Sequence, residues 1–256
     1  MIELTFLGTG TSQGVPTVGC QCSVCTSDDT RDARLRCAVQ VKTNNTTLLV
    51  DTGPDLRQQL LNNNIIEIDA ILFTHEHNDH VIGLDDIRPI YFRKRSNIPT
   101  YALSRVHNEI KKRFSYMFGN NVYPGVAQID THDIDQNTAP FVIGDITVTP
   151  IGVIHGNLPI IGYRFGDIAY ITDASYLSST QMDKLKGLDT LIVNALQRKE
   201  HHSHFTLEEA LGFINSIAPK RAYLTHLSHL MGNHADLELE LPEHIHVAHD
   251  GLKVTI

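Results

Sequence analysis

Histidine and aspartate cluster directly after the apolar run 70–74, at His75, His77, Asp79 and His80. The apolar run predicts a buried strand, and the two-residue period of a strand places His75 and His77 on one face. A turn after His77 would let Asp79 and His80 point back into the same space. Imidazole and carboxylate ligands together suit zinc, manganese or iron. One tetrahedral ion that keeps a position open for water cannot take all four of these ligands from a single loop. The spacing therefore predicts two ions side by side.

Three later apolar runs also stop on a residue that can bind a metal. They end at His155, Asp173 and His226. Each of these alone is as easily an ordinary polar residue at a strand end, and the first stretch could be a loop that is merely rich in histidine. Buried strands rarely end in so many unpaired polar groups, because such groups cost free energy. The repetition therefore favours one shared metal site.

A second group of potential ligands contains three thiols, at Cys20, Cys22 and Cys25. In a chain whose start shows no secretory signal, thiols this close together favour a metal over disulfides. A fourth ligand is needed, and His229 lies three residues after the last strand-end histidine. The alternative is a set of reduced surface cysteines. Cys37 lies on a predicted strand and is expected to be a small core residue.

Composition limits the class of protein. A chain of 256 residues with 41% hydrophobic and 20% charged residues is long enough for a large globular α/β domain. The net charge of −8, with no run of lysine or arginine, argues against a nucleic-acid partner. The first residues carry no basic segment before an apolar run, and no stretch approaches the roughly 20 apolar residues of a membrane span. We expect a cytoplasmic protein without a membrane segment.

The pattern of elements must bring these ligands together. Strands are predicted at 2–7, 37–42, 46–50, 70–74, near 100, twice within 141–151, twice within 162–172, at 190–196, at 222–225, and on both sides of Asp250-Gly251. Helices are predicted at 55–61, 83–93, 104–117, 180–185 and 206–216, whereas 15–36 and 119–137 look irregular. Two groups of strands separated by helices, with no linker, predict a single domain over 1–256. Its two sheets would pack together with helices outside, and the metal loops would share one edge.

The spacing His-x-His-x-Asp-His at a strand end resembles that of the metallo-β-lactamase superfamily. The resemblance implies an α/β fold, the metallo-β-lactamase αβ/βα four-layer sandwich, and a dinuclear hydrolase. It implies one ion held by His75, His77 and His155, a second held by Asp79, His80 and His226, and Asp173 as the bridge between them.

The cysteine cluster and the opening Gly-Thr-Gly-Thr-Ser-Gln-Gly-Val-Pro at 8–16 narrow the resemblance. Together they resemble the phosphoribosyl cyclic phosphodiesterases of the PhnP family over essentially the whole chain. This resemblance implies a structural zinc held on an insert loop at about 15–36, with Cys20, Cys22, Cys25 and His229 as ligands.

Two further residues are expected to support the chemistry. In the family a histidine that binds no metal precedes a helix start, and His204 corresponds to it; with a pKa near neutrality it could protonate a leaving group. The expected catalytic residues are His204 and Asp79. Asp51 is either a hydrogen-bond acceptor that orients a ligand histidine or, as readily, a turn residue. The other polar residues considered are predicted to face solvent: Arg198, His201, His202, His234, His244, His246 and His249.

The predicted function is that of a phosphoric diester hydrolase, which hydrolyses a small, cyclic phosphate ester through a hydroxide that bridges two divalent ions. These ions would be zinc, manganese or iron, beside one structural zinc, and the family's tendency to dimerise predicts a homodimer. A ribonuclease Z-like enzyme that processes tRNA 3′ ends is the alternative; the segment 140–165 is too short for its tRNA-binding arm. A β-lactamase or thioesterase fits less well, because those relatives lack the cysteine cluster. A non-catalytic metal-binding relative would be expected to lose a ligand.

Overall fold

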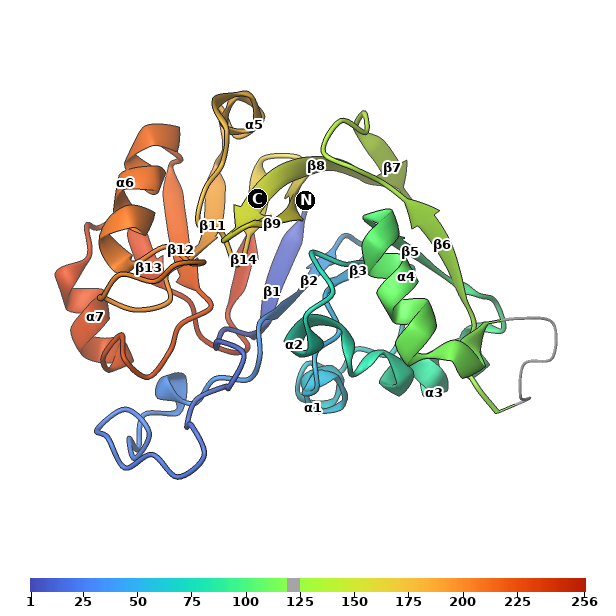
Figure 1. The fold of residues 1–256 in the computed structure, drawn as a ribbon, viewed down its shortest axis with the longest axis horizontal. Helices are drawn as coiled ribbons and strands as arrows, with labels where there is room; N and C mark the ends of the chain where they lie inside the picture. Colours follow the sequence, from blue (N-terminus) through green and yellow to red (C-terminus); the bar gives the residue numbers. More distant parts are fainter. Residues whose placement is uncertain (119–124) are drawn as a thin grey trace.

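The computed structural model describes residues 1–118 and 125–256. In these residues the strands form two sheets of seven strands each (Figure 1). The first sheet runs in the order β14-β1-β2-β3-β4-β5-β6 and is antiparallel from β14 to β3 and parallel from β3 to β6. Its strands are β1 (Glu3–Gly8), β2 (Ala38–Lys42), β3 (Thr47–Val50), β4 (Ala70–Leu72), β5 (Ile98–Ala102), β6 (Ile129–Asp133) and β14 (Lys253–Thr255).

The second sheet repeats this arrangement. It runs in the order β13-β12-β11-β10-β9-β8-β7, antiparallel from β7 to β10 and parallel from β10 to β13. Its strands are β7 (Phe141–Ile143), β8 (Ile146–His155), β9 (Leu158–Phe165), β10 (Ile168–Ile171), β11 (Thr190–Asn194), β12 (Arg221–Thr225) and β13 (Ile245–Val247).

Helices cover the outer face of each sheet. The first sheet carries α1 (Leu56–Asn62), α2 (Asn78–Val81), α3 (Arg88–Lys94) and α4 (Ser104–Arg113), and the second carries α5 (Ser179–Asp183), α6 (Leu207–Ile217) and α7 (His234–Glu240) (Figure 1). Short 3₁₀ turns lie at Thr30–Asp32, Leu84–Ile87 and Ser115–Met117. Within the described ranges, none of the helices combines the length and the apolar character that crossing a bilayer requires.

The alternation of side chains along the strands produces three apolar layers. Leu48 and Val50 of β3 enter the core between the two sheets, where they join Tyr163 and Tyr170 of the second sheet, whereas Leu49 faces the helices. Successive strand residues point to opposite faces, so a strand buried on both sides reads as a continuous apolar run. The result is the predicted four-layer sandwich of helices, two sheets and helices.

The sequence prediction is wrong at β6. Residues 129–133, predicted to be irregular, form β6; most of its side chains are at least partly exposed, so no apolar alternation marks it. Residues 119–124 of that predicted irregular segment lie outside the described residues. The strands predicted on either side of Asp250-Gly251 do form. β13 pairs with β12 and β14 pairs with β1, so this turn carries the chain from one sheet to the other.

Candidate active site

The ligand-type residues lie at the carboxyl ends of strands. Asp51 follows β3, His75 lies just beyond β4, Asp173 lies just beyond β10, and His226 follows β12, while His155 is the last residue of β8. In open α/β sheets the carboxyl ends of parallel strands form the usual ligand-binding edge. Both sheets therefore contribute residues to one place.

Three of these residues have left-handed backbones. The φ angles are 67° at Asp51, 58° at Asp173 and 55° at His226. Residues other than glycine rarely adopt positive φ, and those that do concentrate at functional sites, where the surroundings compensate for the strain. The backbone turns sharply here so that side chains at strand ends face the site.

Close backbone packing fixes the histidine loop. The Thr52 N–H donates to the His80 carbonyl at 2.7 Å, and the Gly83 N–H donates to the Thr52 carbonyl at 2.9 Å. A Cβ atom at Gly53 would lie 2.1 Å from the Asp79 carbonyl oxygen, and one at Gly83 would lie 2.0 Å from the Gly53 carbonyl oxygen. Only glycine permits this approach. Gly53 and Gly83 therefore place the histidine loop against the end of β3, which carries Asp51.

The structure brings the seven predicted active-site ligands into one cluster. Three sets have all their ligand atoms within 4.8 Å of one another. They are His75 with His77 and His155, His75 with His80 and Asp173, and His155 with Asp173 and His204. The remaining two ligands join through neighbours: His226 Nδ1 lies 3.3 Å from Asp173 Oδ2, and Asp79 Oδ2 lies 3.3 Å from His80 Nε2.

Hydrogen bonds orient several of these rings from behind. His80 Nδ1 lies 2.7 Å from Asp51 Oδ2, and His155 Nδ1 donates to the Ser203 carbonyl at 2.8 Å. Asp51 also accepts from the Thr74 N–H and hydroxyl, both at 2.8 Å, and that hydroxyl lies 2.9 Å from His75 Nδ1. Partners of this kind fix the ring orientation and the tautomer of a metal-binding histidine. The geometry therefore favours the orienting role for Asp51 over that of a simple turn residue.

Threonine before a ligand is a signal that the sequence prediction missed. Thr74, Thr172 and Thr225 each directly precede a ligand-type residue, and all three are buried. The Thr172 hydroxyl donates to Asp173 Oδ2 at 2.6 Å. Thr225 Oγ1 lies 3.3 Å from the sulfur of Cys37, which is buried as predicted. The Thr172 hydroxyl thus supports the carboxylate of Asp173, whereas the Thr225 hydroxyl packs against Cys37.

Charge in the cluster is balanced for a cation. Burial opposes protonation of His80, yet the carboxylates of Asp79, Asp173 and Asp51 hold its pKa well above the usual value for histidine. Burial also opposes ionisation of Asp173, but the surrounding histidines, led by His226, hold its pKa well below the usual value. The site thus attracts positive charge at the point where these side chains converge.

The residues present fit a metal. Within residues 1–118 and 125–256, His80 Nε2 and His204 Nδ1 are buried polar atoms that find no hydrogen-bond partner. Buried polar atoms are almost always paired, and an unpaired one commonly marks an ion or water. Mixed imidazole and carboxylate ligands suit zinc, manganese or iron.

His204 lies inside the cluster. Its side chain is 11% exposed, its Nδ1 is 3.8 Å from Asp173 Oδ1, and its ring stacks on His226 at 4.9 Å. Burial, together with nearby His226, lowers the pKa of His204 to about 3 despite Asp173. This pKa differs from the expected value near neutrality, because burial destabilises the protonated ring more than the Asp173 carboxylate stabilises it. At this pKa the neutral form of the His204 ring is favoured at pH 7.

The neighbouring polar residues mostly agree with prediction. His201 is half-buried with its ring 5.1 Å from that of His204, and His202 is exposed. Arg198 pairs with Glu240 at the surface, with its Nη1 2.9 Å from a carboxylate oxygen.

The outlying histidines divide into three groups. His244 is exposed, whereas His246 and His249 are half-buried. The prediction that His234 faces solvent is wrong. His234 is 3% exposed, and its backbone N–H donates to Asp32 Oδ1 at 2.6 Å. Arg34 Nη2 lies 3.3 Å from its Nδ1, so His234 helps to join the C-terminal helix α7 to the N-terminal loop.

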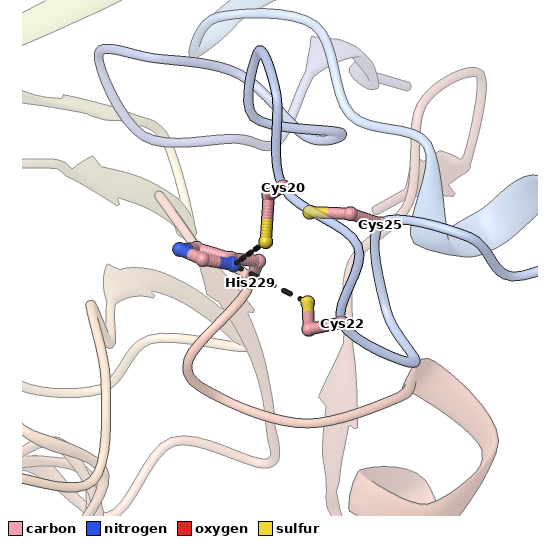
Figure 2. A group of neighbouring side chains, drawn as sticks. All are labelled: Cys20, Cys22, Cys25 and His229. Atoms are coloured by element: carbon pink, nitrogen blue, oxygen red, sulfur yellow. Dashed lines mark hydrogen bonds between the residues drawn. The ribbon is translucent and has the colours of Figure 1, made fainter.

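The predicted cysteine cluster forms beside this site. Cys20, Cys22 and Cys25 from the N-terminal loop and His229 from the loop after β12 point toward one centre, with their ligand atoms within 4.8 Å of one another (Figure 2). The Cys20 and Cys22 sulfurs lie 3.3 and 3.4 Å from His229 Nδ1. The Cys25 N–H and the His229 ring lower the pKa of Cys22 to about 6, which favours the thiolate. Three cysteines and one histidine are a known structural zinc set.

The comparison with known proteins follows from this geometry. The family model described as Beta-lactamase superfamily domain matches residues 46–227. The chain belongs to the β-lactamase superfamily. This membership confirms the predicted fold and superfamily.

Individual relatives place the chain more closely. A solved diphosphatase from the PhnP family is 40% identical, with a TM-score of 0.93, over 100% of this chain and 98% of that one. The short form of human tRNase Z is 20% identical, with a TM-score of 0.74 over 99% of both chains, and shows the shared fold. An octanoyltransferase of Porphyromonas gingivalis is 42% identical over 98% of this chain and 51% of its own length. The chain therefore spans about half the length of that relative.

Proposed function

We propose that this chain hydrolyses a small phosphate ester, with a cyclic phosphate diester as the first candidate. The observation that carries the proposal is the cluster of histidines around Asp173, which gathers ligands from both sheets. The similarity to a PhnP-family diphosphatase supports phosphorus–oxygen bonds as the target. The octanoyltransferase name describes a relative of about twice the length, so it does not decide the chemistry of this chain.

The proposed ligands divide into two sets that share Asp173. One set is His75, His77 and His155; the other is Asp79, His80 and His226. Two divalent cations about 3.5–4 Å apart would lower the pKa of a water molecule and withdraw charge from a phosphoryl oxygen. Among the chain's own residues, Asp51 orients His80, the Ser203 carbonyl orients His155, and Thr172 supports Asp173. His204, whose Nδ1 lies 3.8 Å from Asp173 Oδ1, is the residue that we propose to give a proton to the departing oxygen.

A nucleic-acid substrate is the second candidate. Exodeoxyribonuclease YycJ of Bacillus anthracis is 28% identical over 59% of this chain and 55% of its own length. The net charge of −8 opposes it, because nucleic-acid affinity depends largely on neutralising phosphates with lysine and arginine.

A substrate panel with metal-reconstituted protein tests these candidates. It would contain bis-p-nitrophenyl phosphate, a ribosyl cyclic phosphate, a nucleoside diphosphate, single-stranded DNA and precursor tRNA. We expect the highest kcat/KM on the ribosyl cyclic phosphate, and hydrolysis of neither polymer. Preferred cleavage of DNA or tRNA would replace the proposal with the nucleic-acid candidate, and preferred cleavage of the diphosphate would move the target to an anhydride.

We further propose that residues 1–256 act as one domain, in which the loop at about 15–36 is an insert that holds a structural zinc. A homodimer and a cytoplasmic location stay predictions from the sequence.

Replacing Cys22 with serine should remove this zinc and lower the melting temperature. A structural metal contributes to folding directly, and we expect a fall on the order of 10 °C for a chain of this size. Ser23→Ala, on the same loop and exposed, is the control and should change neither zinc content nor melting temperature. Elemental analysis and calorimetry would measure both. Normal stability of Cys22→Ser combined with loss of the active-site metals would reverse the proposed roles of the two sites.

A further inference from the structure

His77 is held differently from the other ligand histidines of its loop. The Nδ1 atoms of His75 and His80 have partners behind them, in Thr74 and Asp51. His77 is the exposed member of its ligand set. In the described part of the chain its ring has a hydrogen-bond contact only with His75, whose Nε2 lies 3.0 Å from His77 Nδ1. Among the described residues no second hydrogen bond fixes the ring, so the residues on either side of His77 take a larger part in placing it.

Two arginines of α4 contact the residues on either side of His77. Arg113 Nη1 donates to the Glu76 carbonyl at 2.6 Å and to Asn78 Oδ1 at 3.1 Å. Arg105 Nε donates to Glu76 Oε1 at 2.9 Å. Glu76 and Asn78 are the residues directly before and after His77, so the guanidinium of Arg113 spans this ligand.

Helix α4 is a firm base for these contacts. On its inner side His107 is 1% exposed, with its Nδ1 2.6 Å from Asp133 Oδ1 and its Nε2 3.2 Å from Thr100 Oγ1. These partners belong to β6 and β5, and Val106 and Ile110 of α4 are buried in the adjacent apolar layer. These contacts fix α4 against the first sheet, so its arginines hold a fixed position beside the histidine loop.

The pair of Arg105 and Glu76 is partly closed off from solvent. Their side chains are 34% and 15% exposed, and the contact joins Arg105 Nε to Glu76 Oε1. It ties α4 to the residue directly before His77.

We infer that Arg113, supported by Arg105, is a positioning residue that sets His77 for metal binding. This inference rests on the proposed metal site. Residues that support a ligand from behind commonly contribute 10–100-fold to metal affinity. Arg113 can do this because one guanidinium nitrogen, Nη1, donates to acceptors on both sides of His77.

The test compares Arg113→Met with Arg93→Met. Methionine keeps the stem and the helix propensity of arginine but removes the donors. Arg93 lies on α3, is exposed and donates to the Ile66 carbonyl, away from the site. Metal-free protein would be titrated with Co²⁺ against a competing chelator while the visible spectrum is recorded, and its melting temperature would be measured without metal.

We expect Arg113→Met to weaken binding of Co²⁺ by about 10–100-fold and to alter the spectrum, while Arg93→Met binds like wild type. Both metal-free variants should melt within about 2 °C of wild type, as surface substitutions do. Binding by Arg113→Met within twofold of wild type overturns the inference and leaves the proposed function standing. Wild-type protein that binds no Co²⁺ overturns the metal site itself. If Arg113→Met does not fold, Arg113→Lys replaces it: intermediate affinity supports the inference, because the lysine side chain ends one atom short of the position of Nη1, and wild-type affinity overturns it.

Discussion

Replacing Asp173 with asparagine should release at least one active-site metal ion and reduce hydrolysis by about 10³-fold or more. The Asp173 carboxylate is 2% exposed and lies between both proposed ligand sets, with Oδ2 3.5 Å from His80 Nε2 and 3.3 Å from His226 Nδ1. Asparagine keeps the shape and tolerates the left-handed backbone at this position, so the change removes mainly charge. Stabilisation by metals is worth several kcal/mol, and each 1.4 kcal/mol is tenfold in rate.

The measurement is metal content together with turnover of bis-p-nitrophenyl phosphate. Asp167→Asn makes the same chemical change at the exposed turn between β9 and β10, where the side chain is 66% exposed, and should leave both quantities unchanged. Asp173→Ala should lose at least as much as Asp173→Asn, because alanine fits positive φ poorly. A variant Asp173→Asn with two ions and near-normal turnover would show that Asp173 merely ends a strand.

The parts of the molecule that the sequence predicts well depend on neighbours in the chain. The ligands His75 and His77 follow an apolar run whose period is local. The capping box of α6 is also local: the Thr206 N–H donates to Glu209 Oε2 at 2.8 Å, and the Glu209 N–H donates to Thr206 Oγ1 at 3.2 Å. The cysteine cluster needs only one ligand that is distant in the sequence. His229 supplies it, and it lies only three residues after His226.

The parts that were missed depend on contacts between distant residues. β6 is held by its pairing with β5, although its own side chains are mostly polar. The turn after β13 leads from the second sheet to the first because β14 pairs with β1, which lies at the opposite end of the chain. Arg113 reaches the histidine loop across 37 positions of sequence, and a lone arginine at the end of a helix gives no sign of that contact.

Removing the His204 ring should affect esters with poor leaving groups far more than esters with good ones. Hydrolysis expels an oxygen anion from phosphorus, and an alkyl or ribosyl oxygen leaves slowly without a proton. Burial holds the pKa of His204 at about 3 in the pocket, and an anionic phosphate beside the ring would raise this pKa, because opposite charge favours the protonated form. The substrate itself would thus prepare His204 to donate the proton. General acid help of this kind is typically worth about 10²–10⁴-fold.

We therefore expect His204→Ala to keep its metals and to lose about 10²–10⁴-fold in kcat/KM on a ribosyl or alkyl ester, with a much smaller loss on a p-nitrophenyl ester, whose phenolate leaves without a proton. His202→Ala, an exposed neighbour, should lose little on either. Because His204 also groups with His155 and Asp173 within ligand distance, metal content must be measured alongside. Loss of an ion would make His204 a ligand, and equal losses on both esters would make it a phosphate contact. No loss on either ester would remove it from the chemistry, leaving the half-buried His201, whose ring lies 5.1 Å away, as the next residue to replace.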